Sequence, residues 1–370
     1  MNIYEKIGLK KVINASGKMT ALGASAISKD VGDTMKEAAM NYVDIEELIQ
    51  RAGELISRYT LSEDSCVTLG ASAGIAISTA AVIARDNLSL IERLPRSEGL
   101  QNEIIIQKGH CINFGASLTQ MIALGGGVPV EVGQSNKVTK KHIEEAINKN
   151  TAAIIYVKSH HAVQKGMVSM EDMIIVAKEN QIPFILDCAA EEDLLKYVKM
   201  DADLVVYSGG KAIEGPTSGF VTGKKELIHY CKMQYKGIGR AMKVGKENIM
   251  GLLKALENYE NRDAIKIVED QKEVVEWMAS KINAIEGLQA TITVDEAGRE
   301  IYRVKVKTDT IKVTELIKKL ENGNPAIYTR NHYANMGIIN IDPRPLNAGD
   351  EEEIVQQLEL LMAEERNEMV

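Results

Sequence analysis

Short apolar runs alternate with longer segments of helical period through the first two thirds of the chain. The runs stand at residues 103–107 (EIIIQ), 128–132 (VPVEV), 152–157 (AAIIYV), 183–187 (PFILD) and 203–207 (DLVVY). Strands that alternate with helices predict a mainly parallel sheet with helices on both faces. Residues 139–150 and 169–180 place apolar side chains three and four positions apart, so both are predicted to be surface helices.

The pattern changes near residue 246. Residues 246 to about 284 keep a helical period, and short strands and helices follow it to the end of the chain. We therefore expect an N-terminal segment and large domain over residues 1–245, a connecting long helix over 246–285, and a small C-terminal α+β domain over 286–370. The predicted fold class is α/β.

The composition of the chain excludes several classes of protein. The chain has 370 residues, of which 45% are hydrophobic, so it can bury a large core. It has neither a signal peptide nor an apolar run long enough for a membrane span, so we expect a cytoplasmic protein without a membrane partner. The four cysteines show no metal-ligand spacing, and the net charge of −8 opposes a nucleic-acid partner. No metal is expected.

Residues 203–223 (DLVVYSGGKAIEGPTSGFVTG) carry the most informative chemistry. An apolar strand ends here in a turn of small residues that presents Lys211 near Ser208. Asp187 ends another strand, and ligands of open α/β sheets bind beyond the carboxyl ends of strands. We therefore expect Asp187 and Lys211 to face one cavity.

A lysine paired with a carboxylate is the minimum set for pyridoxal 5'-phosphate. The amine forms an imine with the cofactor, and the carboxylate keeps the pyridine nitrogen protonated so that the ring accepts electrons. Taken alone, Asp187 is better interpreted as a helix cap, and only its pairing with Lys211 reverses that interpretation. Ser-x-x-Lys also occurs in serine β-lactamases, but no Ser-Asp-Asn or Lys-Thr-Gly partner is present here.

The cofactor phosphate needs backbone donors at the start of a helix. The segment TLGASAGIAISTAAVIA supplies a strand, a turn of small residues and a helix, with Ser72, Ala73 and Gly74 as the candidate cradle. A close helix–sheet contact explains such a turn about equally well. Ser208 is a candidate for a further hydrogen bond to the cofactor.

Three histidines follow predicted strands at the same edge. His110 comes after the strand 103–107, and we expect its ring to stack on the pyridine ring of the cofactor. His160 and His161 follow the strand 152–157. Because adjacent side chains point apart, they make a poor metal pair, and one of them is expected to contact the substrate.

With these residues placed, the chain resembles the D-glucosaminate-6-phosphate ammonia-lyase family. This family lies in the selenocysteine-synthase-like branch of fold type I, the aspartate aminotransferase superfamily of pyridoxal-phosphate enzymes. The resemblance rests on VINASGKMTALG (12–23), PFILDCAAEEDL (183–194), VYSGGKAIEGPTSGFVTG (206–223) and IGRAMKVGKENI (238–249). The third segment is the most specific, since Ser-Gly-x-Lys followed by Gly-Pro-x-x-Gly is typical of the branch.

The resemblance implies an ammonia-lyase that acts on a 2-amino-2-deoxy sugar acid phosphate. The products are 2-keto-3-deoxy-6-phosphogluconate and ammonia, formed by removal of the α-proton and β-elimination of a hydroxyl group. Lys211 then both carries the cofactor and acts as the general base. The resemblance also implies a homodimer, or a multiple of dimers, with shared active sites.

Such a substrate is anionic, so its site needs fixed cations. Arg240 and Arg330 are the first candidates for binding it, followed by Lys18, Lys243 and Lys165. For each of these residues taken singly, a solvated surface position is the more frequent role.

Other functions stay open on the sequence alone. An L-seryl-tRNA selenium transferase shares the lysine segment, but we expect it to hold tRNA with an additional N-terminal region, and here the Asn-Ala-Ser-Gly motif already begins at residue 14. Another pyridoxal-phosphate lyase, acting on a β-substituted amino acid, is a further alternative. A non-catalytic relative is disfavoured because Lys211 and Asp187 are both present.

Overall fold

The chain forms two compact units in a computed structural model that describes residues 2–159, 161–295 and 300–368. The large unit is Ile27–Asn261. The small unit joins Met1–Ala26 to Arg262–Val370. Each unit has its own hydrophobic core and is described by itself below.

The large unit is built on a seven-stranded sheet with the order β2-β8-β7-β6-β5-β3-β4. The strands are β2 (Asp64–Thr68), β3 (Glu103–Gln107), β4 (Val128–Val132), β5 (Thr151–Val157), β6 (Phe184–Asp187), β7 (Leu204–Ser208) and β8 (Gly219–Gly223). Strand β8 runs in the opposite direction to the other strands of this sheet, so it pairs antiparallel with both β2 and β7, and the pairs from β7 to β4 are all parallel. The predicted mainly parallel α/β sheet is confirmed.

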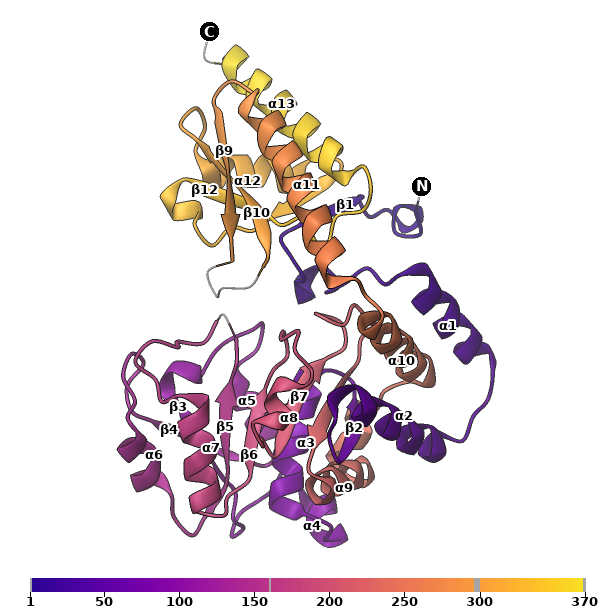
Figure 1. Cartoon of the computed structure of the whole chain (residues 1–370), viewed down its shortest axis with the longest axis vertical. Helices are drawn as coiled ribbons and strands as arrows, with labels where there is room; N and C mark the ends of the chain where they lie inside the picture. Colours follow the sequence, from indigo (N-terminus) through magenta and orange to yellow (C-terminus); the bar gives the residue numbers. More distant parts are fainter. Residues whose placement is uncertain (1, 160, 296–299, 369–370) are drawn as a thin grey trace. The chain divides into compact units, whose positions relative to one another are not determined.

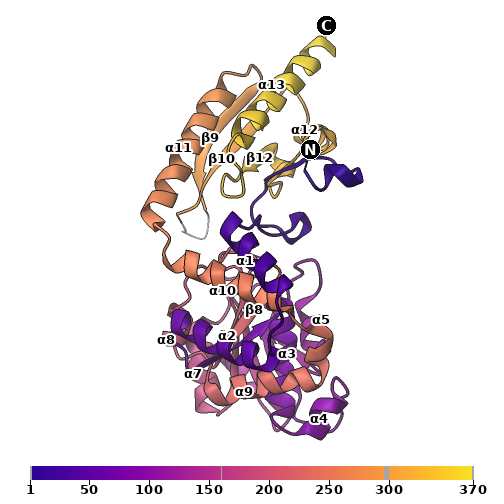
Figure 2. The same cartoon turned by 90° about the vertical axis from the view of Figure 1, so that its right-hand side faces the viewer.

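Helices cover both faces of this sheet (Figures 1 and 2). They are α1 (Lys29–Met40), α2 (Ile45–Thr60), α3 (Ala71–Ala84), α4 (Leu88–Arg93), α5 (Leu118–Leu124), α6 (Lys140–Ala146), α7 (Met170–Glu179), α8 (Lys196–Lys199), α9 (Lys225–Met233) and α10 (Lys246–Glu260). Successive strand residues enter opposite cores, as Ile104 and Ile105 do. One core contains residues of α2, α6, α7 and α10, and the other contains residues of α3, α5 and α9.

The small unit contains a three-stranded antiparallel sheet of order β12-β10-β9. Its elements are β1 (Val12–Ala15), α11 (Ala264–Asn283), β9 (Leu288–Val294), β10 (Tyr302–Thr308), α12 (Val313–Asn322), β11 (Ala326–Thr329), β12 (Ile338–Ile341) and α13 (Asp350–Glu368). Helices α11 and α13 pack side by side (Figures 1 and 2). Their apolar side chains and those of the sheet form one core.

The structure divides the chain differently from the expected domains. The N-terminal segment belongs to the small unit because β1 pairs in parallel with β11, from Val12 opposite Ala326 to Ala15 opposite Thr329. This pairing between distant segments leaves no local signal in the sequence.

The expected single helix over residues 246–285 is two helices, α10 and α11. The break has a local cause, because the Asp263 side chain accepts a hydrogen bond from the Lys266 N–H at 3.0 Å and so caps the start of α11. Across the described ranges, no helix has both the length and the apolar character that a membrane span requires.

Candidate active site

The carboxyl ends of β5, β6 and β7 place the main candidate residues at one edge of the large sheet. In the parallel register Val157 stands opposite Asp187, and Asp187 stands opposite Val206. Ser208 ends β7 two residues farther on, and the turn after it carries Lys211. Asp187, Ser208 and Lys211 therefore lie at the same sheet edge, where open α/β sheets bind ligands.

Backbone hydrogen bonds fix the turn that carries Lys211. The Gly209 N–H donates to the Ser218 carbonyl at 2.8 Å, and the Gly215 N–H donates back to the Gly209 carbonyl at 2.7 Å. A Cβ atom on Gly209 would lie 2.2 Å from the Ser218 Oγ, so only glycine fits there. The turn is closed on itself, and it presents Lys211 from a rigid base.

Burial sets the ionisation of the Asp187–Lys211 pair. It raises the pKa of Asp187 to about 6, although the Ala189 N–H, which donates to Oδ1 at 3.0 Å, and the charge of Lys211 act in the opposite direction. Burial also lowers the pKa of Lys211, against the attraction of Asp187. Each group is thus held toward its neutral form, which makes the Lys211 amine a better nucleophile and base than an exposed lysine.

The amino end of α3 provides a place for an anion in the large unit. Helix α3 begins at Ala71, so the N–H groups of Ala71, Ser72 and Ala73 have no carbonyl one turn earlier in the helix. A Cβ atom on the capping residue, Gly70, would meet nothing within 4 Å, so the space next to this residue, at the start of the helix, is open. Gly70 was not among the residues predicted from the sequence.

Gly74 has a different role from the predicted one. Its N–H donates to the Gly70 carbonyl at 2.9 Å, so this donor is already used inside the helix. A Cβ atom on Gly74 would lie 2.6 Å from the Val206 Cγ1. The residue therefore allows α3 to pack closely on β7, and only Ser72 and Ala73 of the predicted cradle keep available donors.

His110 is not placed for the predicted stacking. Its side chain is fully buried, with its ring edge-on to Tyr156 at a centroid distance of 4.5 Å. Its Nδ1 accepts a hydrogen bond from the Val157 N–H at 3.1 Å, which joins the end of β3 to the end of β5. Burial lowers the pKa of His110 to about 4, so the ring is neutral near pH 7. The side chain exposes no face on which a ligand ring could stack.

The remaining polar candidates of the large unit lie on its surface. His161 is exposed, and its backbone N–H donates to the Ser159 Oγ at 3.2 Å. His160 lies outside the described residues. Arg240, in the short helix Ile238–Met242, is exposed, and so are Lys243 and Lys165. No contact between described residues of the large unit holds these cations toward Lys211.

The pairing of β1 with β11 brings the small unit's two predicted cations to one sheet edge. Both strands run in the same direction, and Ala15 stands opposite Thr329 at their carboxyl ends. Arg330 follows Thr329 directly, and Lys18 follows Ala15 by three residues. Both side chains are half-buried.

A cluster of charged side chains in the small unit was not predicted from the sequence. It consists of Arg303, Arg330, Arg344, Asp295 and Asp342, and we call it the arginine cluster. Asp342 is fully buried and binds both Arg303 Nε at 3.0 Å and Arg344 Nη2 at 2.7 Å. Burial, followed by the charge of Arg303, lowers the pKa of Arg330. These residues are scattered along the sequence, so only the fold brings them together.

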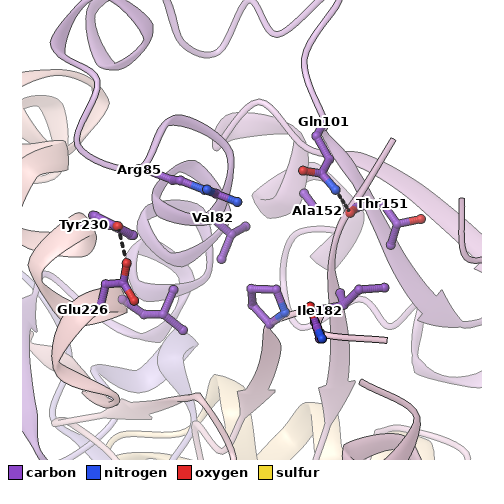
Figure 3. Close-up of a pocket in the computed structure, with 11 residues that line it drawn as sticks. Val82, Arg85, Gln101, Thr151, Ala152, Ile182, Glu226 and Tyr230 are labelled. Atoms are coloured by element: carbon purple, nitrogen blue, oxygen red, sulfur yellow. Dashed lines mark hydrogen bonds between the residues drawn. The ribbon is translucent and has the colours of Figure 1, made fainter. Parts of the chain in front are cut away.

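A pocket with a volume of about 270 Å³ lies at the opposite edge of the large sheet (Figure 3). It is lined by Thr151 at the amino end of β5 and by Pro183 just before β6, so it is remote from the carboxyl ends of these strands. Its Glu226 carboxylate accepts a hydrogen bond from Tyr230 at 2.6 Å, and its Gln101 amide donates to the Thr151 carbonyl at 2.7 Å. We do not assign the active site to this pocket.

The residues at the carboxyl edge fit pyridoxal phosphate. A buried carboxylate, a lysine of lowered pKa and the open amino end of a helix match the cofactor's ring nitrogen, aldehyde and phosphate. Within the described parts of the chain, no three His, Cys, Asp or Glu side chains gather as a metal site would require.

Comparisons with known proteins agree with this arrangement. The family model "L-seryl-tRNA selenium transferase" (SelA) matches residues 12–315. The chain is 46% identical to D-glucosaminate-6-phosphate ammonia lyase of Salmonella typhimurium strain 14028s, over 96% of this chain and 97% of that one. A solved structure of D-glucosaminate-6-phosphate ammonia-lyase superposes with a TM-score of 0.94 at 45% identity, covering 99% of both chains.

A relative with a different activity is also similar over nearly the whole chain. The 5'-C-glycyluridine monooxygenase-decarboxylase of a Streptomyces species is 40% identical, over 97% of this chain and 92% of that one. Two different reactions are therefore named among proteins that share at least 40% of their residues with this chain.

Proposed function

Because the chain belongs to the D-glucosaminate-6-phosphate ammonia-lyase family, in the selenocysteine-synthase-like branch of fold type I, we propose that it converts D-glucosaminate 6-phosphate into 2-keto-3-deoxy-6-phosphogluconate and ammonia. The observation that carries this proposal is the 46% identity to an enzyme of that name over 96% of the chain. Its cofactor is pyridoxal 5'-phosphate, as in the other enzymes of fold type I.

The geometry of the large unit supports the chemistry that this reaction needs. Pyridoxal phosphate supplies an electron sink next to the carbon that bears the amine. Lys211 would hold the cofactor through its Nζ, and the same amine would take the α-proton of the substrate. Asp187 would keep a proton on the ring nitrogen. The N–H groups of Ala71, Ser72 and Ala73 would bind the cofactor phosphate, and Ser208 would donate a further hydrogen bond.

The substrate's anionic groups call for cations. We assign substrate binding to Arg330 first, because it is half-buried and its neighbours fix its backbone. Arg240, Lys18, His160 and His161 are secondary candidates. The proposal includes a cytoplasmic homodimer, or a multiple of dimers, with shared active sites.

The direct test uses the purified holoenzyme with D-glucosaminate 6-phosphate. We expect ammonia and a 2-keto acid to form in equal amounts, with no added RNA and no added metal. Unphosphorylated glucosaminate should react more slowly. The absence of a keto acid from every phosphorylated amino sugar acid tested would contradict the proposal.

A second candidate is oxidative decarboxylation of a glycyl-nucleoside, favoured by the 40% identity to the Streptomyces monooxygenase-decarboxylase. The two reactions differ in their need for oxygen, because elimination of a hydroxyl group and hydrolysis consume none. We expect keto acid release at the same rate in air and under nitrogen. Oxygen uptake with release of carbon dioxide from a 5'-C-glycyluridine substrate would favour the second candidate.

Selenium transfer to seryl-tRNA is supported only by the family model and by relatives at lower identity, such as the Clostridium perfringens enzyme at 27%. A tRNA partner needs an extended basic surface, whereas this chain has a net charge of −8. We expect no tight binding of seryl-tRNA at physiological salt. Such binding, together with no keto acid from any amino sugar acid, would promote this function.

A further inference from the structure

The segment that follows Asp187 is tied to the neighbouring strand of the large sheet. Asp187 ends β6, and residues 188–195, which we call the Asp187 loop, lead from it to the short helix α8. On β7, the hydroxyl of Tyr207 donates to the Asp193 carbonyl of this loop at 2.9 Å. One phenol thus joins the Asp187 loop to the strand that leads into the Lys211 turn.

The Tyr207 side chain lies inside the core of the large unit. It is only 1% exposed, and its ring packs against Phe220 with the centroids 5.2 Å apart. Burial raises the pKa of the phenol, so the hydroxyl keeps its proton and serves as a donor. Asp193 itself is exposed. The hydrogen bond from Tyr207 therefore holds the carbonyl of a surface residue inward, against β7.

The start of the Asp187 loop binds the Asp187 carboxylate. The Cys188 N–H donates to the Val206 carbonyl of β7 at 2.9 Å, which fixes the first residue of the loop. The next N–H, that of Ala189, donates to Asp187 Oδ1 at 3.0 Å. Asp187 Oδ2 accepts no hydrogen bond from the residues that the structure describes. The Ala189 N–H therefore orients the carboxylate and leaves Oδ2 available.

We propose that Tyr207 is a positioning residue, whose hydroxyl holds the Asp187 loop against β7 so that the Ala189 N–H keeps the Asp187 carboxylate in place for the cofactor. The inference rests on the proposed function, because it takes Asp187 as the partner of the ring nitrogen. It goes beyond that function by assigning part of the orientation of Asp187 to a phenol buried in the core.

Removal of the Tyr207 hydroxyl tests this hydrogen bond. Tyr207→Phe keeps the ring and its packing against Phe220, but it leaves the Asp193 carbonyl without its donor. A carbonyl that faces an apolar ring is unfavourable, so we expect the loop to move until this carbonyl contacts water. Ala189 moves with the loop, and the Asp187 carboxylate then loses the N–H that favours its ionised form.

The first measurement is a double-mutant cycle in kcat, with the holoenzyme and D-glucosaminate 6-phosphate. Tyr207→Phe alone should lower kcat about tenfold and change KM by less than about twofold, because the loss falls on the transition state. In the Asp187→Asn background the same change should alter kcat by less than about twofold, since Tyr207 then has no carboxylate to position. A merely structural role would lower kcat equally in both backgrounds.

The second measurement is thermal unfolding of the apoprotein, which needs neither cofactor nor substrate. Loss of the Ala189 donor should raise the pKa of Asp187 further above its present value of about 6. A raised folded pKa of a carboxyl group costs stability only where that group is ionised. Tyr207→Phe should therefore lower Tm more at pH 8 than at pH 4.5. Lys211 and Cys188 also interact with Asp187, and the Asp187→Asn background, which keeps both, should abolish the difference.

Tyr235→Phe is the matched control, because the Tyr235 hydroxyl donates to the Val67 carbonyl of the same unit at 2.6 Å. It should lower Tm by a similar amount at both pH values. The same loss of Tm at pH 4.5 and pH 8 in Tyr207→Phe would overturn the inference, and so would an equal loss of kcat in the two backgrounds. A pH-dependent loss of Tm without ammonia release would contradict the proposed function alone. Ammonia release with a pH-independent loss of Tm would contradict this inference alone.

Discussion

Asp187 and Lys211 are held toward their neutral forms by the burial that they share, although their charges attract each other. A surface pair of the same residues would be fully ionised and without catalytic use. Here burial raises the pKa of Asp187 to about 6 and lowers the pKa of Lys211 below its ordinary value, as suits a cofactor-binding pair.

Replacing Lys211 with alanine should abolish covalent attachment of the cofactor and all turnover. The folded state should keep its stability, because the change removes a polar pocket residue and no core volume. Absorbance of the bound cofactor, ammonia release and Tm measure the three effects. Lys225→Ala, at an exposed lysine of the same unit, is the matched control and should behave like the unchanged protein. Normal keto acid formation by the Lys211 variant would exclude the mechanism.

Replacing Asp187 with asparagine should lower kcat by about a hundredfold or more while KM changes little. The amide cannot hold a proton on the ring nitrogen by ionic attraction, so the loss falls on the transition state and not on substrate binding. Steady-state kinetics with the cofactor-saturated variant measure both constants. A change confined to KM would remove Asp187 from this role.

The same substitution should stabilise the cofactor-free protein at pH 8. The folded pKa of Asp187, about 6, is above the ordinary carboxyl value of 3.8. The cost of ionising the buried group is therefore absent below about pH 4, grows between pH 4 and 6, and is complete above pH 6, where it amounts to about 3 kcal/mol. Thermal unfolding of both apoproteins at pH 4.5 and pH 8 should show a clearly larger gap at the higher pH. An equal gap at both values would argue against a raised pKa.

Replacing Gly70 with alanine should weaken cofactor binding without a loss of stability. The backbone at Gly70 is extended and an added methyl meets no atom within 4 Å, so the folded state should change by less than about 0.5 kcal/mol. The methyl would, however, occupy the space beside the first N–H groups of α3, and the dissociation constant for pyridoxal phosphate should rise roughly tenfold.

The control for Gly70→Ala is Gly74→Ala, four residues farther along the chain and within α3. A methyl on Gly74 would press on Val206, so Gly74→Ala should lower Tm strongly. Titration of the apoproteins with pyridoxal phosphate, beside their unfolding curves, separates the two effects. Unchanged affinity in Gly70→Ala would move the phosphate site away from α3.

Replacing Arg330 with alanine should raise KM for D-glucosaminate 6-phosphate by well over tenfold, since a charge-assisted pair contributes about 1.5–3 kcal/mol. Arg330→Lys keeps the charge but loses the bidentate fork, so its KM should lie between those of the unchanged protein and Arg330→Ala. Arg366→Ala, at a partly exposed arginine of the same unit that pairs with Glu286 at 2.5 Å, is the control. Equal KM values for the Arg330 and Arg366 variants would contradict substrate binding by Arg330.

The large sheet and its reactive edge were predictable because their signals are local. Five apolar runs marked the strands, and the turn of small residues after 203–207 marked Lys211. Asp187 was found because the ends of parallel strands meet at one edge. The prediction for His110 used the same rule, but its side chain turns inward to the Val157 N–H, and a strand-end position does not reveal that direction.

The small unit was less predictable because its key contacts join distant segments. The parallel pairing of β1 with β11 and the meeting of Arg303, Arg344 and Asp342 depend on the complete fold. The end of α10 was missed because the apolar period continues past the cap at Asp263. Likewise, Gly74 is as small as a residue of a phosphate cradle should be, but here a glycine is required because the helix packs closely against Val206.

The parallel pairing of β1 with β11 also determines when the protein can finish folding during its synthesis. Val12 leaves the ribosome early, whereas its partner Ala326 follows roughly 300 residues later. At about 5–20 residues per second, the first strand waits on the order of 15–60 s for its neighbour. The large unit is one continuous stretch and can fold in that interval. The nascent chain therefore carries an unpaired strand through most of its translation, and a ribosome that stops before residue 326 releases a protein whose first strand has no partner.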